Sequence, residues 1–188
     1  MLHALILSDG PYTLRPMTEA DVAPLRALAA AHAGEYAHMG SFPTAGPYYT
    51  GALTAPDQMP FVTLVGGEHA GATRYMDMRP EHRRLEIGST WLAPAHMRTP
   101  ANRTFKRLLL EHAFEQMGIL RVELKTDILN IRSQRAIEGL GAVREGVLRR
   151  HMLRPDGTQR DTVMYSITAE EWPEVRARLP ASSAADTD

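Results

Sequence analysis

The hydrophobic and polar positions along the chain predict one α/β domain in which strands and helices alternate. Apolar and polar residues alternate over residues 12–16 and 84–92, as in half-buried strands, whereas apolar residues recur at helical spacing over 101–117. The predicted elements in chain order are strand 12–16, a helix from Thr18 to about Ala31, a loop over 34–60 with one short helix near 49–55, strands 61–65, 70–78 and 84–92, helix 101–117, strand 121–126, helix 130–140, strands 143–153 and 159–167, and a last helix that begins after 168–171. This order is typical of an α/β (α+β) fold with a mixed central sheet of about seven strands and helices packed on it.

The strand predicted over residues 84–92 carries a carboxylate away from the bulky core. Its alternation separates two sets of side chains, Leu85, Ile87 and Trp91 on one face and Glu86, Gly88 and Thr90 on the other. Glu86 is therefore expected between small residues, on the face opposite the bulky ones.

The composition is that of an ordinary folded chain and excludes several classes of chemistry. Of the 188 residues, 44% are hydrophobic and 23% are charged, so a packed core is expected. We predict one domain over residues 1–180 and a disordered tail over 181–188. The sequence has no cysteine, which excludes disulfides, thiolate zinc sites and a cysteine nucleophile.

Charge and targeting signals narrow the expected partners. The formal net charge is -1 at pH 7, which argues against a dedicated nucleic-acid binder. No apolar run approaches the ~20 residues of a membrane span, and the N-terminus lacks the basic flank of a secretory signal. The 8 histidines show no metal-ligand spacing. We therefore expect a cytoplasmic protein with no metal site and no membrane or nucleic-acid partner.

The segment between strand 84–92 and helix 101–117 has the properties of an anion-binding site. A strand there runs into a loop that opens a helix, so unpaired backbone N–H groups and the positive end of the helix dipole converge. Residues 97–107 contain several basic side chains and no acid, namely Arg98, Arg103, Lys106 and Arg107. A phosphate or pyrophosphate suits such a site, and a solvated basic helix start is the alternative.

Two stretches of the sequence resemble the GNAT N-acetyltransferases, particularly their RimJ/RimL-like branch. The first comprises residues 85–88 (Leu-Glu-Ile-Gly), residues 91–94 (Trp-Leu-Ala-Pro), a loop and residues 106–114. The second comprises residues 127–133 and 141–146. The resemblance implies a mixed sheet with helices on both faces and a splayed pair of parallel strands. Acetyl-CoA would lie between those two strands, with its pyrophosphate on the basic loop.

The resemblance also implies which residues hold acetyl-CoA, the cosubstrate. The family's phosphate loop reads Gln/Arg-x-x-Gly-x-Gly/Ala, whereas this chain has Met97, Pro100 and Asn102 at the first, fourth and sixth positions. Pro100 removes one N–H donor, and Asn102 tolerates the left-handed conformation better than most residues. The residues expected at the cofactor are Arg98, Thr99, Asn102, Arg103 and Thr104 at the phosphates, Trp91 and Leu92 beside the acyl arm, and Asn130, which alternatively only caps its helix.

Two side chains are candidates for the catalytic groups, because acetyl transfer to an amine needs a base and a proton for the leaving thiolate. Glu86 stands at the offset from the phosphate loop where many family members place their basic glutamate, which makes it the general base by resemblance. The alternative is a strand-face glutamate that meets solvent or pairs with Arg83 or Arg84. Ser133 matches the RimL-like serine that protonates the thiolate, or it is an ordinary first-turn serine.

These features predict an acetyl-CoA-dependent N-acetyltransferase that transfers the acetyl group directly to a primary amine, in a protein N-terminus or a small molecule. By resemblance, a backbone N–H near Trp91 would stabilise the oxyanion, a homodimer is expected, and the acceptor side would include Glu35, Tyr36, His38 and Tyr49. The altered phosphate loop leaves two alternatives open. One is a non-catalytic acyl-CoA-binding or sensing module on the same fold, and the other is a partner-binding scaffold that binds no CoA.

Overall fold

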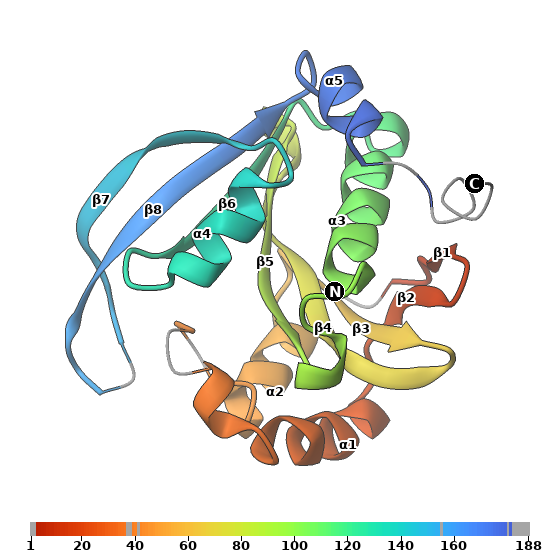
Figure 1. The fold of residues 1–188 in the computed structure, drawn as a ribbon, viewed down its shortest axis with the longest axis vertical. Coiled ribbons are helices and arrows are strands. Elements are labelled where there is room, and N and C mark those ends of the chain that lie inside the picture. Colours follow the sequence, from red (N-terminus) through yellow and green to blue (C-terminus); the bar gives the residue numbers. More distant parts are fainter. Residues whose placement is uncertain (1–2, 37–38, 41, 155, 180, 182–188) are drawn as a thin grey trace.

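The computed structural model describes residues 3–36, 39–40, 42–154, 156–179 and 181, which form a sheet with helices on both faces (Figure 1). Apart from residue 181, the predicted tail over 181–188 lies outside the described residues. The strands are β1 (Leu7–Asp9), β2 (Tyr12–Pro16), β3 (Met59–Val65), β4 (Glu68–Arg79), β5 (Arg84–Leu92), β6 (Arg121–Asp127), β7 (Val143–Leu153) and β8 (Gln159–Thr168). The helices are α1 (Glu19–Ala30), α2 (Gly46–Thr54), α3 (Ala101–Glu111), α4 (Ile131–Glu138) and α5 (Trp172–Ala177), with shorter turns η1 (Ala33–Tyr36), η2 (Pro80–His82), η3 (Pro94–His96) and the π-helical η4 (His112–Gln116).

Within the described residues, eight strands form one mixed sheet in the order β1-β2-β3-β4-β5-β6-β8-β7. Neighbouring strands are antiparallel except β5 and β6, which run parallel. The predicted mixed sheet is confirmed. The additional strand is β1, whose three residues are too few to show an alternating pattern. No helix in the described part of the chain is long and apolar enough to cross a membrane.

Each face of the sheet carries its own apolar core. On one face α3, α4 and α5 pack over buried residues that include Phe105, Leu124 and Tyr165. On the other face α1 and α2 enclose a second cluster around Leu25 and Tyr49. Figure 1 shows α3 and α4 flanking β5, with α1 and α2 at the bottom of the molecule. The two faces therefore present different surroundings to any side chain of β5 and β6.

The predicted helix ends agree with the structure. The backbone N–H of Thr18 donates to Asp21 at 2.8 Å, as in a capping box, and α1 begins at the next residue. The helix predicted over 101–117 consists of α3 and the π-helical turn η4 that continues it. Gly118 follows with a φ of 63°, which is the left-handed conformation that a helix C-terminus often requires.

The parallel strands β5 and β6 separate soon after they begin. Their register contains only the pairs Arg84–Arg121, Leu85–Val122 and Glu86–Glu123, although β5 has 9 residues and β6 has 7. Beyond these pairs the two strands diverge, as expected for a splayed parallel pair. The facing edges of both strands are consequently without a strand partner over most of their length.

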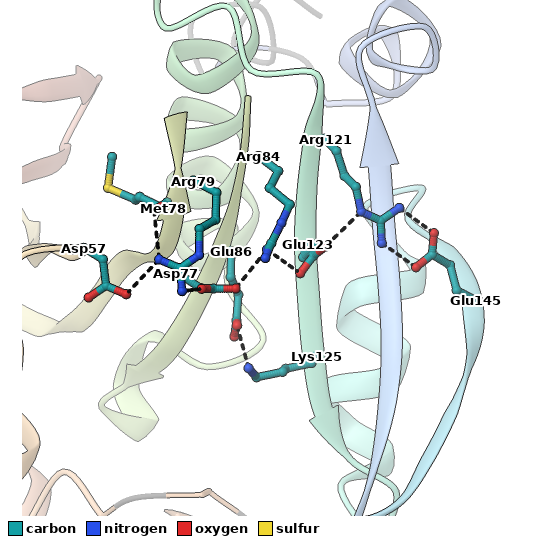
Figure 2. A network of polar contacts seen from close by, with 10 residues as sticks. All are labelled: Asp57, Asp77, Met78, Arg79, Arg84, Glu86, Arg121, Glu123, Lys125 and Glu145. Atoms are coloured by element: carbon teal, nitrogen blue, oxygen red, sulfur yellow. Dashed lines mark hydrogen bonds and ion pairs between the residues drawn. The ribbon is translucent and has the colours of Figure 1, made fainter. Parts of the chain in front are cut away.

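Ion pairs across one face of the sheet hold the paired ends of β5 and β6 together (Figure 2). Arg84 on β5 lies 2.8 Å from Asp77 on β4 and 3.4 Å from Glu123 on β6. Arg121 in turn lies 2.9 Å from Glu123 and 2.5 Å from Glu145 on β7. The charges alternate in sign along this network, so the attractive contacts fix the register at the point where the strands are still paired.

A bulge in β5 changes which residues face which core. Ala72 of β4 pairs with Trp91 and Arg74 pairs with Gly88, so one residue of β4 opposes two residues of β5, and Ser89 takes a φ of 48°. An extra residue reverses the alternation that follows it. Leu85 and Ile87 belong to the core under α3, whereas Trp91 belongs to the cluster under α1 and α2. The predicted shared face of these three residues is therefore wrong, and Thr90 lies on the α3 face.

Gly71 permits the close approach of β4 to the bulged strand. A Cβ at this position would lie 2.1 Å from the carbonyl oxygen of Trp91, and the φ of Gly71 is 155°. We expect Gly71→Ala to lower the free energy of unfolding by about 3 kcal/mol or more, because backbone must move to admit the methyl group. Gly51→Ala in α2 is the matched control, since a Cβ there would have nothing within 4 Å. Denaturant unfolding checks both, and equal stabilities would contradict the expectation.

Candidate active site

Glu86 is a buried carboxylate beside the divergence of β5 and β6. It is 4% exposed, and its Oε2 lies 2.7 Å from Nζ of Lys125 on β6 (Figure 2). Gly88 leaves room for this carboxylate, because a Cβ there would lie 2.5 Å from Oε1 of Glu86. Burial raises the pKa of Glu86, and the charge of Lys125 opposes that shift. A carboxyl group with a raised pKa is suited to acid–base chemistry near neutral pH.

The alternative surroundings expected for Glu86 are wrong. It does not meet solvent, and neither neighbouring arginine pairs with it. Arg84 contacts Asp77 and Glu123, and Arg83 donates a hydrogen bond to the carbonyl of Gly118 at 2.8 Å. Both arginines are therefore engaged elsewhere, and the ion-pair partner of Glu86 is Lys125 of β6.

Lys125 is a site residue that motif matching misses. Along β6, charged residues at 121, 123 and 125 alternate with buried Val122 and Leu124. Glu123 is in register with Glu86, so Lys125 emerges two residues further along on the same face. The signal in the sequence is the strict alternation of charged and apolar residues along this predicted strand.

The chain has two lysines, Lys106 and Lys125, and the charge of Glu86 interacts with both. Lys106 is 6% exposed and points from α3 into the sheet, where Nζ donates to Oγ1 of Thr90 at 2.6 Å. Thr90 shares a further hydrogen bond of 2.7 Å with Thr73. Burial lowers the pKa of Lys106 to about 7, and the charge of Glu86 opposes that shift. Lys106 is therefore an interior group.

The loop that enters α3 presents unpaired backbone N–H groups, as an anion site requires. Within the described residues, no hydrogen bond is donated by the N–H groups of Arg98, Thr99, Asn102 and Arg103. Arg98 takes the left-handed conformation with a φ of 60°, whereas Asn102, the residue suggested for that geometry, lies in the first turn of α3. The fixed φ of Pro100 starts the helix early, and Asn102 is already helical.

The predicted basic patch at the start of α3 is wrong for half of its members. Lys106 is interior, and Arg107 is buried between Asp9 at 2.6 Å and Glu111 at 2.7 Å. The helical period turns these two side chains toward the protein, which a count of charges does not reveal. Arg98 is exposed on the loop itself.

Three further predicted phosphate ligands are partly engaged by other groups. The guanidinium of Arg103 donates to the carbonyl of Arg178 at the end of α5, which leaves its backbone N–H for an anion. Thr104 is buried, and its N–H donates to the carbonyl of Pro100 at 2.9 Å. Thr99 is exposed, and its hydroxyl accepts a hydrogen bond from the N–H of Ala101 at 3.2 Å. The backbone, rather than the side chains, offers most of the donors.

Two tyrosines, one in η1 and one in α2, form hydrogen bonds to the bulged strand β5. The hydroxyl of Tyr36 donates to the carbonyl of Leu92 at 3.1 Å, and its ring meets the ring of Trp91 edge-on at 5.5 Å. The hydroxyl of Tyr48 donates to the carbonyl of Ser89. Trp91 and Leu92 are both buried, so they form part of the wall beside the diverging strands.

The other residues predicted on the acceptor side, Glu35, His38 and Tyr49, do not form one cluster in the described structure. Tyr49 is fully buried in the core under α2 and donates to the carbonyl of Pro43 at 2.7 Å. Glu35 lies in η1 and pairs with Arg132 of α4 at 2.7 Å, which bridges the two sides of the diverging strands. His38 lies outside the described residues.

Asn130 caps α4, which confirms its structural role. Its Oδ1 accepts a hydrogen bond from the backbone N–H of Ser133 at 3.0 Å. Ser133 is half-buried in the first turn of the helix. A role of either side chain toward a cofactor stays a prediction.

Comparison with known proteins decides the family. The family model described as the acetyltransferase (GNAT) domain matches residues 12–143. The chain belongs to the GNAT family. Its enzyme class is therefore that of the acyltransferases, and the fold expected from the resemblance is the fold observed.

Relatives of this GNAT domain are found among both sequences and solved structures. The uncharacterized N-acetyltransferase YoaA of Bacillus subtilis (strain 168) is 31% identical over 100 residues, which cover 53% of this chain and 55% of that protein, so the match spans about half of the curated relative. A T. thermophilus protein assigned as an acetyltransferase is 37% identical with a TM-score of 0.85, over 95% of this chain and 97% of that one. Mycobacterium smegmatis RimJ in complex with CoA-disulfide is similar in fold, with 24% identity and a TM-score of 0.78 over 96% and 93% of the chains.

Asn130 provides a test of the helix cap in this GNAT domain. We expect Asn130→Ala to lower the free energy of unfolding by about 1 kcal/mol, because an N–H at the start of α4 loses its acceptor. Asn130→Asp keeps a capping oxygen and is expected to stay close to the parent in stability. Equilibrium unfolding followed by circular dichroism compares the three proteins. An alanine variant as stable as the parent would show that the cap contributes nothing.

Lys106 predicts a pH-dependent stability. In the unfolded chain the Lys106 ammonium keeps its proton up to the ordinary pKa of 10.5, whereas in the folded protein it loses the proton near pH 7. Between these values the unfolded state binds more protons, so the free energy of unfolding rises with pH in that window and is lowest below it. We expect Lys106→Met to be more stable at pH 7 by about 1 to 4 kcal/mol and to lose this rise. Unfolding of both proteins from pH 6 to 10 measures the difference, and parallel profiles would contradict the assignment.

Proposed function

We propose that this GNAT domain transfers the acetyl group of acetyl-CoA directly to a primary amine and belongs to the RimJ/RimL-like branch. The observation that carries the proposal is the position of Glu86, a buried carboxylate with a raised pKa where β5 and β6 diverge. Residues 127–133 and 141–146 support the branch. A cytoplasmic location and a homodimer stay predictions of the sequence.

The residues present fit acetyl-CoA, which would supply the acetyl group as an activated thioester. The N-terminal end of α3, a helix of 11 residues, supplies a positive dipole end for the phosphates. The unpaired N–H groups there are those of Arg98, Thr99, Asn102 and Arg103. The edge of β5 near Trp91 has no strand partner on the β6 side, so its backbone is available to the acyl arm.

Each group near the point where β5 and β6 diverge has a separate role in acetyl transfer. Glu86 accepts a proton from the substrate ammonium, which frees the nitrogen lone pair for attack on the thioester carbonyl. Lys125 holds the carboxylate in place through the 2.7 Å ion pair. A backbone N–H at the bulge of β5 stabilises the negative charge that develops on the carbonyl oxygen. As the new C–N bond forms and the C–S bond breaks, Ser133 supplies a proton to the departing thiolate.

The role of Glu86 can be tested against a neighbouring carboxylate. Glu86→Gln should lower kcat for acetyl transfer by about 100- to 10,000-fold, because the amide cannot accept the proton, while acetyl-CoA binding is retained. Glu123→Gln is the matched control on the same face, since its carboxylate is held by Arg84 and Arg121. Release of free CoA over a broad panel of amines measures turnover, and calorimetry measures cofactor affinity.

The pH profile gives the same test an independent readout. Turnover should fall as the pH drops through the raised pKa of Glu86, and Glu86→Gln should abolish this limb. Acetyl-CoA binding without turnover on any amine would favour the non-catalytic acyl-CoA-binding module. Absence of acetyl-CoA binding would contradict both interpretations and leave the partner-binding scaffold.

A further inference from the structure

Arg160 is a buried arginine, and one of its guanidinium nitrogens is unpaired within the described residues. It lies near the start of β8 and is 5% exposed. Its Nε is buried and has no hydrogen-bond partner, and within the described residues its closest carboxylate oxygen, Oδ2 of Asp127, is 3.9 Å away. Arginine is rarely buried unless it is paired, because an uncompensated charge in the interior costs several kcal/mol.

Asp127 already accepts hydrogen bonds from other donors. Arg154 contacts it through two nitrogens, with Nε 2.7 Å from Oδ2 and Nη2 3.0 Å from Oδ1. The backbone N–H of Leu129 also donates to Oδ1 at 2.9 Å. The bidentate Arg154 contact is the strong geometry for an arginine and a carboxylate, so Asp127 is the partner of Arg154. Arg160 is left as an additional positive charge.

Within the described residues, the charges that act on Arg160 leave a positive excess. Glu86 is paired with Lys125, and Asp127 is paired with Arg154. Burial and the charges of Lys125 and Arg160 lower the pKa of His151, which favours the neutral imidazole. The two ion pairs cancel, and the guanidinium of Arg160 remains in excess.

Arg160 lies on the face of the sheet that carries Glu86. Glu86 is in register with Glu123, and Asp127 follows on the same face of β6 four residues later. Asp127 is in register with Thr162, and Arg160 precedes Thr162 by two residues on β8. The negative charge of Glu86 accordingly acts on the pKa of Arg160, which burial lowers.

Gly40 and Met152 cover part of the Arg160 guanidinium. A Cβ at Gly40 would lie 2.5 Å from its Nη1, so the chain after η1 comes as close to the charge as a residue without a side chain allows. The methyl carbon of Met152 on β7 would lie 3.9 Å from the same Cβ, so Gly40, Met152 and the guanidinium lie close together. Apolar cover of this kind excludes water and strengthens any contact that the guanidinium makes to an anion.

We infer that Arg160 binds a carboxylate of the acceptor, so that the substrate is a small molecule that carries a carboxylate as well as the amine to be acetylated. The inference rests on the proposed amine acetylation at Glu86. A guanidinium presents several N–H donors in a planar fork, which matches a carboxylate in a bidentate pair. The same positive charge disfavours a polyamine, whose other ammonium groups would be repelled.

Matched pairs of acceptors test this inference on the unaltered protein. Free amino acids and ω-amino acids are compared with their carboxamides and with spermidine, with kcat/KM for acetyl transfer as the readout. For an accepted amino acid, kcat/KM should exceed that of its carboxamide by about 10- to 100-fold, the range expected when hydrogen bonds to a charged group are lost. Equal values for acid and amide, or a preference for spermidine, would overturn the inference.

Substitution of Arg160 provides the second arm. Arg160→Gln should remove the preference for the acid over the amide while turnover of the amide persists. Arg149→Gln removes an exposed arginine of the neighbouring strand β7 and should keep the preference, which separates a direct contact from the general effect of charge. Thermal unfolding shows whether either variant fails to fold. If one does, the comparison of acids with carboxamides on the unaltered protein still tests the inference.

Product binding separates failure of this inference from failure of the proposed function. Calorimetry with N-acetyl amino acids and their N-acetyl carboxamides, in the presence of CoA, requires no turnover. Binding of the acids by the parent and its loss in Arg160→Gln would support the carboxylate site even if the panel contains no efficient acceptor. Turnover of uncharged amines with no binding of any N-acetyl amino acid would overturn the site and leave the acetyltransferase proposal intact.

Discussion

The divergence of β5 and β6 is the constraint on which the rest of the structure depends. Within the described part of the chain, two parallel strands that pair for only three residues leave most of both facing edges without a strand partner. Such an opening is costly in a sheet unless another molecule or other elements satisfy the edges. The alternating ion pairs at the closed end, from Asp77 through Arg84 and Glu123 to Glu145, hold the strands where they still pair (Figure 2).

The bulge at Ser89 is the second feature that shapes the site. It turns Trp91 toward Tyr36 on one face and Thr90 toward Lys106 on the other, so a single additional residue supplies both walls. Glu86 and Lys106 are both buried in this part of the structure. Burial raises the pKa of a carboxyl group and lowers that of an amine, which gives the direction of the shift at each of these residues.

Most of the fold could be predicted because local rules decide it. The capping box at Thr18, the glycine at 118 and the alternation in β6 each act within a few residues, and each agrees with the structure. The site was only partly predictable. The motif identifies Glu86, whereas Lys125 contacts Glu86 only in the folded sheet, where Arg160 lies on the same face.

The sequence by itself determined the order of the elements, the mixed sheet and the resemblance to the GNAT family, because hydrophobic period and motif spacing are properties of neighbouring residues. Tertiary structure alone decided which charges act at the site. Helical rotation buries Lys106 and Arg107, and a bulge reverses the face of Trp91. Long-range pairing assigns Asp127 to Arg154 and leaves Arg160 in excess. Charge compensation depends on distance in space, and the linear order of residues does not contain that distance.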